Sequence, residues 1–314
     1  MVIMKLLEYL FLFLIFPGFV FSSTAGLLAG WFDRKVTARL QWRVGPHWYQ
    51  NFMDIAKLFL KETLIPKGAS RIIFFAMPLF AIAGSTLAST IIMVINQAPS
   101  STFIGDLIVV VYLMIIPPLA LMLGGFASGN PLASLGGSRE MKLMLSYELP
   151  FLLALVVPIA RAGYSIQLGG IITYQASHGP VFFSISGALS FIVMLLCMQA
   201  KLGFVPFDMP EAETEIVSGM YIEYSGPALA MLKIAKAILT FALPALLITL
   251  YFGGIIFTVY GILRGISEYL LILLLMIVIK NTNPRVRIDQ AVRFFWRMPT
   301  VMAILAVVLA CLGL

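Results

Sequence analysis

The chain has 314 residues, of which 61% are hydrophobic and 11% charged; its mean hydropathy is +1.01 and its formal net charge is +7. This composition excludes a soluble domain, and repeated uncharged runs of about twenty residues predict an all-α polytopic membrane protein. Nucleic-acid binding is excluded because no solvated basic domain is visible. Two cysteines in separate apolar runs and two isolated histidines form neither an iron–sulfur ligand set nor a metal-binding spacing, so we expect no cofactor in this chain.

Eight apolar runs predict eight transmembrane helices within a single domain, residues 1–314. The predicted spans are residues 6–31, 72–95, 107–126, 141–160, 181–200, a sixth from about Pro227, 265–279, and an eighth from about Met298. Pro117-Pro118 predicts a bend in the third span. The uncharged residues 237–263 are too long for one straight span and could contain a ninth.

The distribution of basic residues decides between eight and nine spans. With eight, sixteen of the 21 basic residues lie in loops on one side of the membrane. A ninth span would move the last five of them to the other side, against the positive-inside rule. We therefore predict eight spans in the cell membrane, both termini outside, and cytoplasmic loops at residues 33–71, 127–142, 201–226 and 280–297.

The first loop contains an amphipathic segment at residues 52–61. There Phe52, Ile55 and Phe59 oppose Asp54 and Lys57. This pattern predicts a helix that lies in the membrane interface. The simpler interpretation is an anchor whose lysines snorkel toward water.

The third loop carries five of the fourteen acidic residues: Asp208, Glu211, Glu213, Glu215 and Glu223. Pro210 suits the first turn of a helix, with Asp208 or Met209 as its cap. In such a helix the acids at i, i+3 and i+7 from Asp208 share one face. Like charges that lie so close favour the uptake of a proton, as a relay requires. The alternative is that acids in a first turn only complement the helix dipole.

Further charged residues lie in or beside the predicted spans: Glu140, Glu148, Lys233 and Lys236. Charges at membrane depth are functional candidates. For Glu148 we expect Arg139, Lys142 or a lysine of another helix as the partner, although a purely structural, hydrogen-bonded acid is also possible. The two lysines are three residues apart on one face, and we expect them to meet carboxylates or water inside the bundle.

Residues 206–226, PFDMPEAETEIVSGMYIEYSG, resemble the signature of complex I subunit 1, the quinone-site membrane subunit. Patterns of the same family recur at residues 33–35, 41–46, 57–62, 147–148 and 284–290. Two features resemble the branch of energy-converting membrane-bound nickel–iron hydrogenases and related archaeal respiratory complexes. The path from Gly45-Pro46 to the amphipathic segment is short, and lysines stand at positions 233 and 236.

The resemblance implies a non-catalytic subunit that anchors a peripheral redox arm and couples electron transfer to proton or sodium translocation through buried carboxylates. The implied proton and charge relay comprises Glu140, Glu148, Asp208, Glu211, Glu213, Glu215, Glu223, Lys233 and Lys236. The implied redox-arm docking residues are Arg34, Lys35, Arg39, Arg43, Arg139, Arg285 and Arg287. From the residues alone, positive-inside anchoring explains Arg285 and Arg287 equally well.

The implied partners are a nickel–iron-type large subunit, an iron–sulfur small subunit, antiporter-like membrane subunits and lipid. Iron–sulfur clusters and a nickel–iron centre would belong to those partner subunits. Two alternatives stay open: quinone-binding subunit 1 of a complex I-type NADH dehydrogenase, and a stand-alone ion transporter. The residues do not decide whether electrons end on protons, quinone or a sulfur compound.

Overall fold

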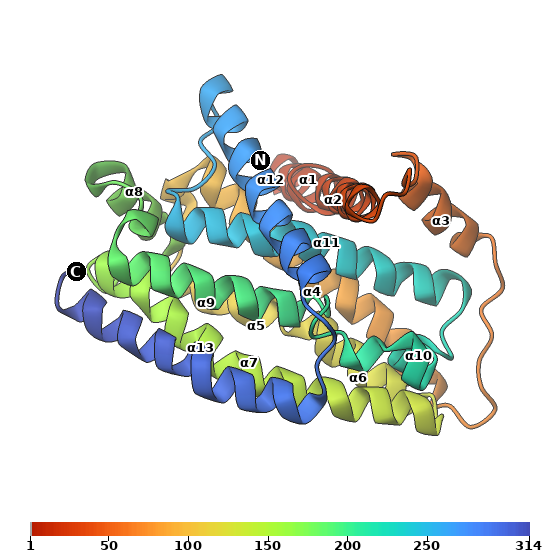
Figure 1. Ribbon diagram of the computed structural model, residues 1–314. Coiled ribbons are helices and arrows are strands. Elements are labelled where there is room, and N and C mark those ends of the chain that lie inside the picture. The colour runs from red at the N-terminus through yellow and green to blue at the C-terminus, as the bar shows by residue number, and fades with distance from the viewer. Residues whose placement is uncertain (1) are drawn as a thin grey trace. The chain divides into compact units, whose positions relative to one another are not determined.

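The computed structural model of the protein describes the backbone of residues 2–314 and the side chains of residues 7–314. All regular structure in this range is helical (Figure 1). Seven helices are long and apolar enough to cross a membrane, and residues 185–201 form an eighth, shorter apolar helix. The predicted all-α, polytopic fold class is therefore confirmed. The orientation of the termini stays a prediction.

The longer helices are α1 (Val2–Leu14), α2 (Phe19–Leu40), α3 (Gln50–Phe59), α4 (Arg71–Gln97), α5 (Asp106–Leu113), α6 (Ile116–Ala127), α7 (Pro131–Arg161), α8 (Leu168–His178), α9 (Ile185–Lys201), α11 (Gly226–Tyr251), α12 (Val259–Thr282) and α13 (Ile288–Cys311). The short elements are α10 (Glu213–Ile216) and the 3-10 turns η1 (Pro99–Ser101), η2 (Val181–Phe183), η3 (Met209–Glu211) and η4 (Gly219–Tyr221).

The chain divides into two compact units. Unit 1 comprises Met1–Thr90, Val111–Met141 and Asp208–Ala242, and unit 2 comprises Ile91–Val110, Lys142–Phe207 and Leu243–Leu314. The division falls within α4, α5, α7 and α11. The expectation of a single domain stays a prediction.

The core of unit 1 is built where α4, α6 and α11 meet the end of the acidic segment. Phe74 and Tyr224 stack with ring centroids 4.2 Å apart, and the Tyr224 hydroxyl donates to the Phe74 carbonyl at 3.2 Å. That hydroxyl lies so close to Gly124 that a Cβ there would be 2.1 Å away. A glycine at this position of α6 is therefore what lets the tyrosine enter the core.

In unit 2 the second half of α7 packs with α9 and α13, which lie side by side in Figure 1. Their contact is made by small or branched residues, with Val157, Ala306 and Ala310 buried against Leu189. Small side chains allow helix backbones to approach closely, which is the main source of helix association in a bilayer. The Tyr251 hydroxyl adds a hydrogen bond to the Ala154 carbonyl at 3.3 Å.

The structure corrects several predicted boundaries. The bend expected at Pro117-Pro118 is a break between α5 and α6, just before the two prolines. Helix α11 continues to Tyr251, and Gly253 and Gly254 turn the chain with φ of 87° and 78° into α12. The uncharged residues 237–263 are thus shared between two helices, and the described residues contain no ninth span between them.

Two segments expected as loops are partly helical. Helix α2 extends to Leu40, and α7 already begins at Pro131, so most of residues 127–142 belong to a helix. The glycine- and serine-rich start of α7 has weak helix propensity. It is packed closely nonetheless, since a Cβ on Gly136 would lie 3.0 Å from the Gly219 Cα. Tertiary packing therefore overrides the local preference.

Candidate functional site

The acidic segment does not form the single helix that the sequence predicts. Asp208 does stand at the N-cap position of η3, but the helical path is interrupted at Ala212, whose ψ is 101°. After α10, Val217 and Ser218 adopt left-handed conformations with φ of 50° and 71°. The prediction that the acids at 208, 211 and 215 share one helix face is therefore wrong. The chain folds back here because Gly219 packs against the Pro210 carbonyl, where a Cβ would be only 2.1 Å away.

Because the chain folds back, the acidic segment lies beside Lys236 of α11 and Glu140 of α7, both in unit 1. Lys236 Nζ donates to both carboxylate oxygens of Glu211 at 2.7 Å. Glu140 is buried on α7, 7% exposed, and lies within electrostatic range of Glu211 and Lys236. Tyr221 completes this group, which we call the unit 1 cluster. The pKa of Tyr221 is raised well above its ordinary value, by burial first and then by the charges of Glu211 and Glu140.

Two other acids of the segment have partners outside this cluster. Glu215, 62% exposed, accepts from Arg139 at 2.6 Å, and the same guanidinium donates to the Met209 carbonyl at 3.3 Å. Glu223 accepts from the Asn130 amide at 2.5 Å. Glu213 is exposed, and so is Lys233, whereas Asp208 is buried. Of the nine predicted relay residues, the structure therefore gathers Glu140, Glu211 and Lys236.

A separate buried ion pair lies in unit 2. Glu148 of α7 and Lys201 of α9 approach with 3.7 Å between Oε2 and Nζ, and the lysine side chain is 0% exposed. Within the described residues neither Lys201 Nζ nor the Glu148 oxygens make a hydrogen bond. The ammonium instead lies 4.5 Å from the centre of the Phe151 ring, an additional cation–π stabilisation. Of the partners considered for Glu148, namely Arg139, Lys142 and a lysine of another helix, the structure shows the last.

The chain is similar to known proteins over almost its whole length. The sequence model of the family described as NADH dehydrogenase matches residues 12–311. The chain belongs to this family. A relative from Anoxybacillus flavithermus, named as the H subunit of NADH-quinone oxidoreductase, is 32% identical over 299 residues, 91% of this chain and 87% of the relative. The protein of the same name from Geobacillus thermodenitrificans is also 32% identical, over 95% of this chain and 90% of its own length.

A solved structure supports the same assignment at the level of the fold. A chain of the membrane-bound sulfane sulfur reductase, an archaeal respiratory membrane complex, superposes with a TM-score of 0.85 at 28% identity, covering 93% of this chain and 96% of that one. As a member of the NADH dehydrogenase family, the chain is a multi-pass membrane subunit, of the H or first type, of a complex I-like respiratory complex. The predicted family is thereby confirmed.

Two residues that the sequence analysis did not single out, Lys201 and Tyr221, belong to these sites, and a third, Glu268, forms another ion pair in unit 2. Lys201 was counted as a loop residue, although it is the only charged residue of α9 and that isolation could have revealed it. Tyr221 carries no such signal. Glu268 lies inside the span α12 and pairs with Arg264 one turn away at 2.7 Å, while Arg264 also donates to the Phe252 carbonyl at 2.6 Å.

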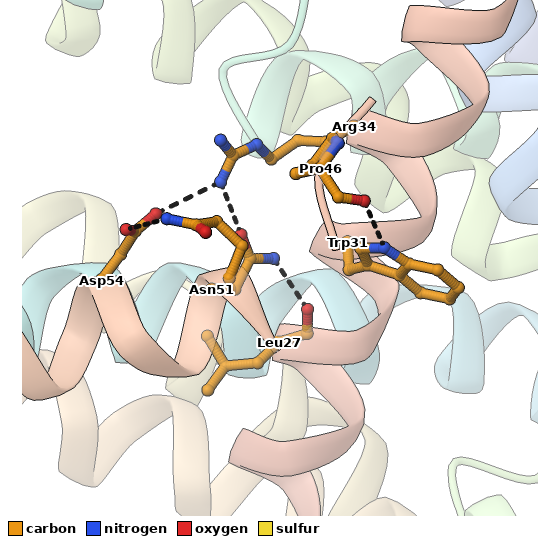
Figure 2. A network of polar contacts seen from close by, with 7 residues as sticks. Leu27, Trp31, Arg34, Pro46, Asn51 and Asp54 are labelled. Atoms are coloured by element: carbon orange, nitrogen blue, oxygen red, sulfur yellow. Dashed lines mark hydrogen bonds and ion pairs between the residues drawn. The ribbon is translucent and has the colours of Figure 1, made fainter. Parts of the chain in front are cut away.

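The predicted docking residues of this family member are mostly exposed. Arg39, Arg43, Arg285 and Arg287 are exposed and Lys35 is half-buried. Figure 2 shows that Arg34 has a local function: it donates to Asn51 at 2.7 Å and to Asp54 at 3.3 Å. Asn51 in turn donates to the Leu27 carbonyl at 2.9 Å, so this network holds the amphipathic helix α3 on α2. Docking of a redox arm on these residues stays a prediction.

Proposed function

We propose that this chain anchors the peripheral redox arm of a hydrogenase-like respiratory complex and couples electron transfer to proton or sodium translocation through its buried carboxylates. The observation that supports this proposal best is the unit 1 cluster. Glu211 holds the Lys236 ammonium there, with the buried carboxyl group of Glu140 and a neutral phenol within electrostatic range. A cluster in which two carboxyl groups lie near one cation responds to a proton or to a nearby change in charge.

The geometry suggests how such a change would move. When Glu211 is ionised, both of its oxygens hold Lys236. A proton taken up by Glu211 weakens that attraction and leaves Glu140 as the other carboxyl group within electrostatic range of the lysine. Charge would thus pass from the acidic segment, on the side we assign to the redox arm, to a helix that spans the membrane.

Two further observations favour the hydrogenase-like branch. The structural neighbour belongs to a sulfane sulfur reductase. The chain also passes directly from Gly45-Pro46 to α3 and carries lysines at 233 and 236, the two features by which its sequence resembles the hydrogenase branch. In this proposal the nickel–iron-type large subunit, the iron–sulfur small subunit and their clusters dock on the cytoplasmic face, and antiporter-like subunits adjoin the chain in the membrane.

The test is glutamine substitution in the intact complex, reconstituted in vesicles. Glutamine keeps the size of glutamate and part of its hydrogen bonding but removes the charge. In Glu211→Gln, Glu213→Gln and Glu148→Gln variants we expect assembly to survive and redox-linked ion transport to fall much more than electron transfer to an artificial dye, with Glu148→Gln the stronger of the latter two. Glu62→Gln, an exposed carboxylate outside the cluster, is the matched control. Wild-type transport in both Glu148→Gln and Glu213→Gln would rule the relay out, and loss of assembly in Glu213→Gln, whose side chain is exposed, would indicate docking instead.

The second candidate is a quinone-binding subunit, favoured by the name of the relatives, which are called NADH-quinone oxidoreductases. The two candidates differ in what the purified complex holds. We expect no stoichiometric quinone in it and no inhibition by quinone-site blockers. Detection of either would move this chain to the quinone-reducing branch while leaving the coupling function intact.

A further inference from the structure

The start of α13 carries an open depression in unit 2, with a volume of about 380 Å³, that no site described above uses. It is lined by Gln290, Arg293, Phe294, Arg297 and Met298. The two arginines are exposed and one helical turn apart, so both guanidinium groups lie on the same face. Arg293 Nε donates to the Asp289 carbonyl at 3.2 Å, which leaves its terminal nitrogens available.

The charge on this face is unbalanced. Within the described side chains neither Arg293 nor Arg297 belongs to an ion pair, in contrast to Arg34, Arg139 and Arg264. The nearest acid on the same helix is Asp289, which is exposed one turn before Arg293. Two guanidinium groups at this spacing match the oxygens of a phosphate, which they bind with paired hydrogen bonds.

The other half of the lining is apolar, and its position on the helix is informative. Arg297 is the last charged residue of α13, and residues 298–311, the rest of this candidate membrane span, are uncharged. Met298 is 59% exposed and the neighbouring Trp296 is 58% exposed, as is common for tryptophan at the boundary between lipid and water. The depression therefore has its charged half at the polar end of this candidate span and its apolar half toward the uncharged part.

From this combination we propose that the depression binds one anionic phospholipid, with its phosphate on Arg293, Arg297 and Gln290 and its acyl chain along Phe294 and Met298. A soluble anion would gain nothing from the apolar half. A protein carboxylate would match the arginines but would not explain their placement at the polar end of a membrane span. The site is independent of the proposed relay, because none of its residues belongs to the unit 1 cluster or to the Glu148–Lys201 pair.

The test uses the whole complex in detergent, with binding of phosphatidylglycerol and of phosphatidylcholine measured by native mass spectrometry. We expect the wild-type complex to retain phosphatidylglycerol and to bind phosphatidylcholine far less. The variant Arg293→Gln/Arg297→Gln should bind phosphatidylglycerol roughly 30-fold more weakly, on the scale of about 1 kcal/mol for each arginine near an anionic surface. The matched control Lys67→Gln/Arg71→Gln also removes two exposed positive charges and should bind like wild type.

Two more variants separate lipid from other ligands. Arg293→Lys/Arg297→Lys keeps the charge and should recover part of the affinity, and Met298→Gln should weaken binding of long-chain more than of short-chain phosphatidylglycerol. Equal binding by the wild type and the glutamine variant would overturn the proposal, as would an equal loss in the control. Loss of a partner subunit with unchanged lipid would show that a protein occupies the depression. Displacement of the lipid by inorganic phosphate at equal concentration would show a site for small anions.

Discussion

The unit 1 cluster and the Glu148–Lys201 pair of unit 2 each join a lysine to a glutamate, but they differ in burial and in hydrogen bonding. In unit 1 the lysine and glutamate are both about one quarter exposed and make two hydrogen bonds of 2.7 Å. In unit 2 the lysine is fully buried, the closest approach is 3.7 Å, and no hydrogen bond satisfies either group within the described residues.

This difference indicates how much stability each pair loses when one of its partners is removed. A hydrogen-bonded pair near water is stable in itself and can lose a partner at modest cost. A buried pair without hydrogen bonds is held only by mutual attraction, so removing either partner leaves an uncompensated charge in a medium of low dielectric. We therefore expect the unit 2 pair to be the more sensitive to mutation and the unit 1 cluster to be the more tolerant.

The strongest test of this comparison is a double-mutant cycle on the unit 2 pair. Lys201→Met leaves Glu148 buried alone, and Glu148→Met leaves the lysine alone, so each should destabilise the subunit by about 3–5 kcal/mol. The double variant replaces both charges by apolar side chains of similar length and should regain most of that stability. Thermal inactivation of the purified complex measures the three effects. Additive losses would show that the two residues do not act as a pair.

The same cycle separates stability from function. If the pair takes part in charge transfer, the double variant should be stable but deficient in redox-linked ion transport. Normal transport in a stable double variant would assign the pair a structural role only. Electron transfer to an artificial dye is the internal control, because it reports an intact redox arm.

The second prediction concerns the other side of the comparison. Glu211→Gln removes the ion pair and at least one of the two hydrogen bonds to Lys236, but water and Glu140 remain available to the lysine. We expect a loss of about 1–2 kcal/mol in the same inactivation assay, which is less than for Lys201→Met because solvent screens the exposed part of the pair. Lys236→Gln should behave similarly. A loss larger than that of Lys201→Met would reverse the order of the two regions.

Most of the fold could be predicted because hydropathy reports membrane spans directly. The spans and the family followed from apolar runs and from residues 206–226. The breaks in the acidic segment could not be predicted, since left-handed Val217 and Ser218 depend on packing of Gly219 against Pro210, not on local preference. The helical start of α7 could not be predicted for the same reason, because contacts distant in sequence stabilise a segment of weak helix propensity.

The candidate site was predictable in its residue types and less so in its pairings. The carboxylates were visible from their rarity in an apolar chain, and a lysine of another helix was one of the three partners considered for Glu148. Which acids come together depends on how the acidic segment folds back, and the sequence pattern placed Glu211 and Glu215 on one face although they bind different cations. Lys201 was missed because its position at the end of α9 resembles that of a loop lysine.

A third prediction concerns a more exposed ion pair, for which we expect a smaller loss of stability than for the two pairs above. Arg139 and Glu215 form a close contact, but the glutamate is 62% exposed. Arg139→Gln should therefore destabilise the subunit by about 0.5–1 kcal/mol, and high salt should remove most of the difference. Lys142→Gln, an exposed neighbour on α7, is the control for loss of one positive charge. A salt-independent loss would mean that the hydrogen bond from Arg139 to the Met209 carbonyl dominates.

The smallest effect at neutral pH is expected for Tyr221→Phe, and it tests the electrostatics of the unit 1 cluster. The pKa of Tyr221 is raised by burial and by the charges of Glu211 and Glu140. A raised pKa means that the folded protein holds the phenolic proton more firmly than the unfolded chain does. Stability from this group is fully present below the ordinary pKa of about 10 and is lost as the pH rises above it, at about 1.4 kcal/mol per pH unit.

Wild type should therefore inactivate faster between pH 10 and 11, and Tyr221→Phe should show a shallower fall over the same range, on the scale of about 1 kcal/mol. The two proteins should differ little at pH 8. Tyr164→Phe is the control for general effects of alkali on the complex. It also removes one phenolic hydroxyl, but Tyr164 is 72% exposed. If Tyr221→Phe and wild type lose stability in parallel up to pH 11, the phenol is not shielded from water as the structure indicates, and the cluster is more open than its contacts imply.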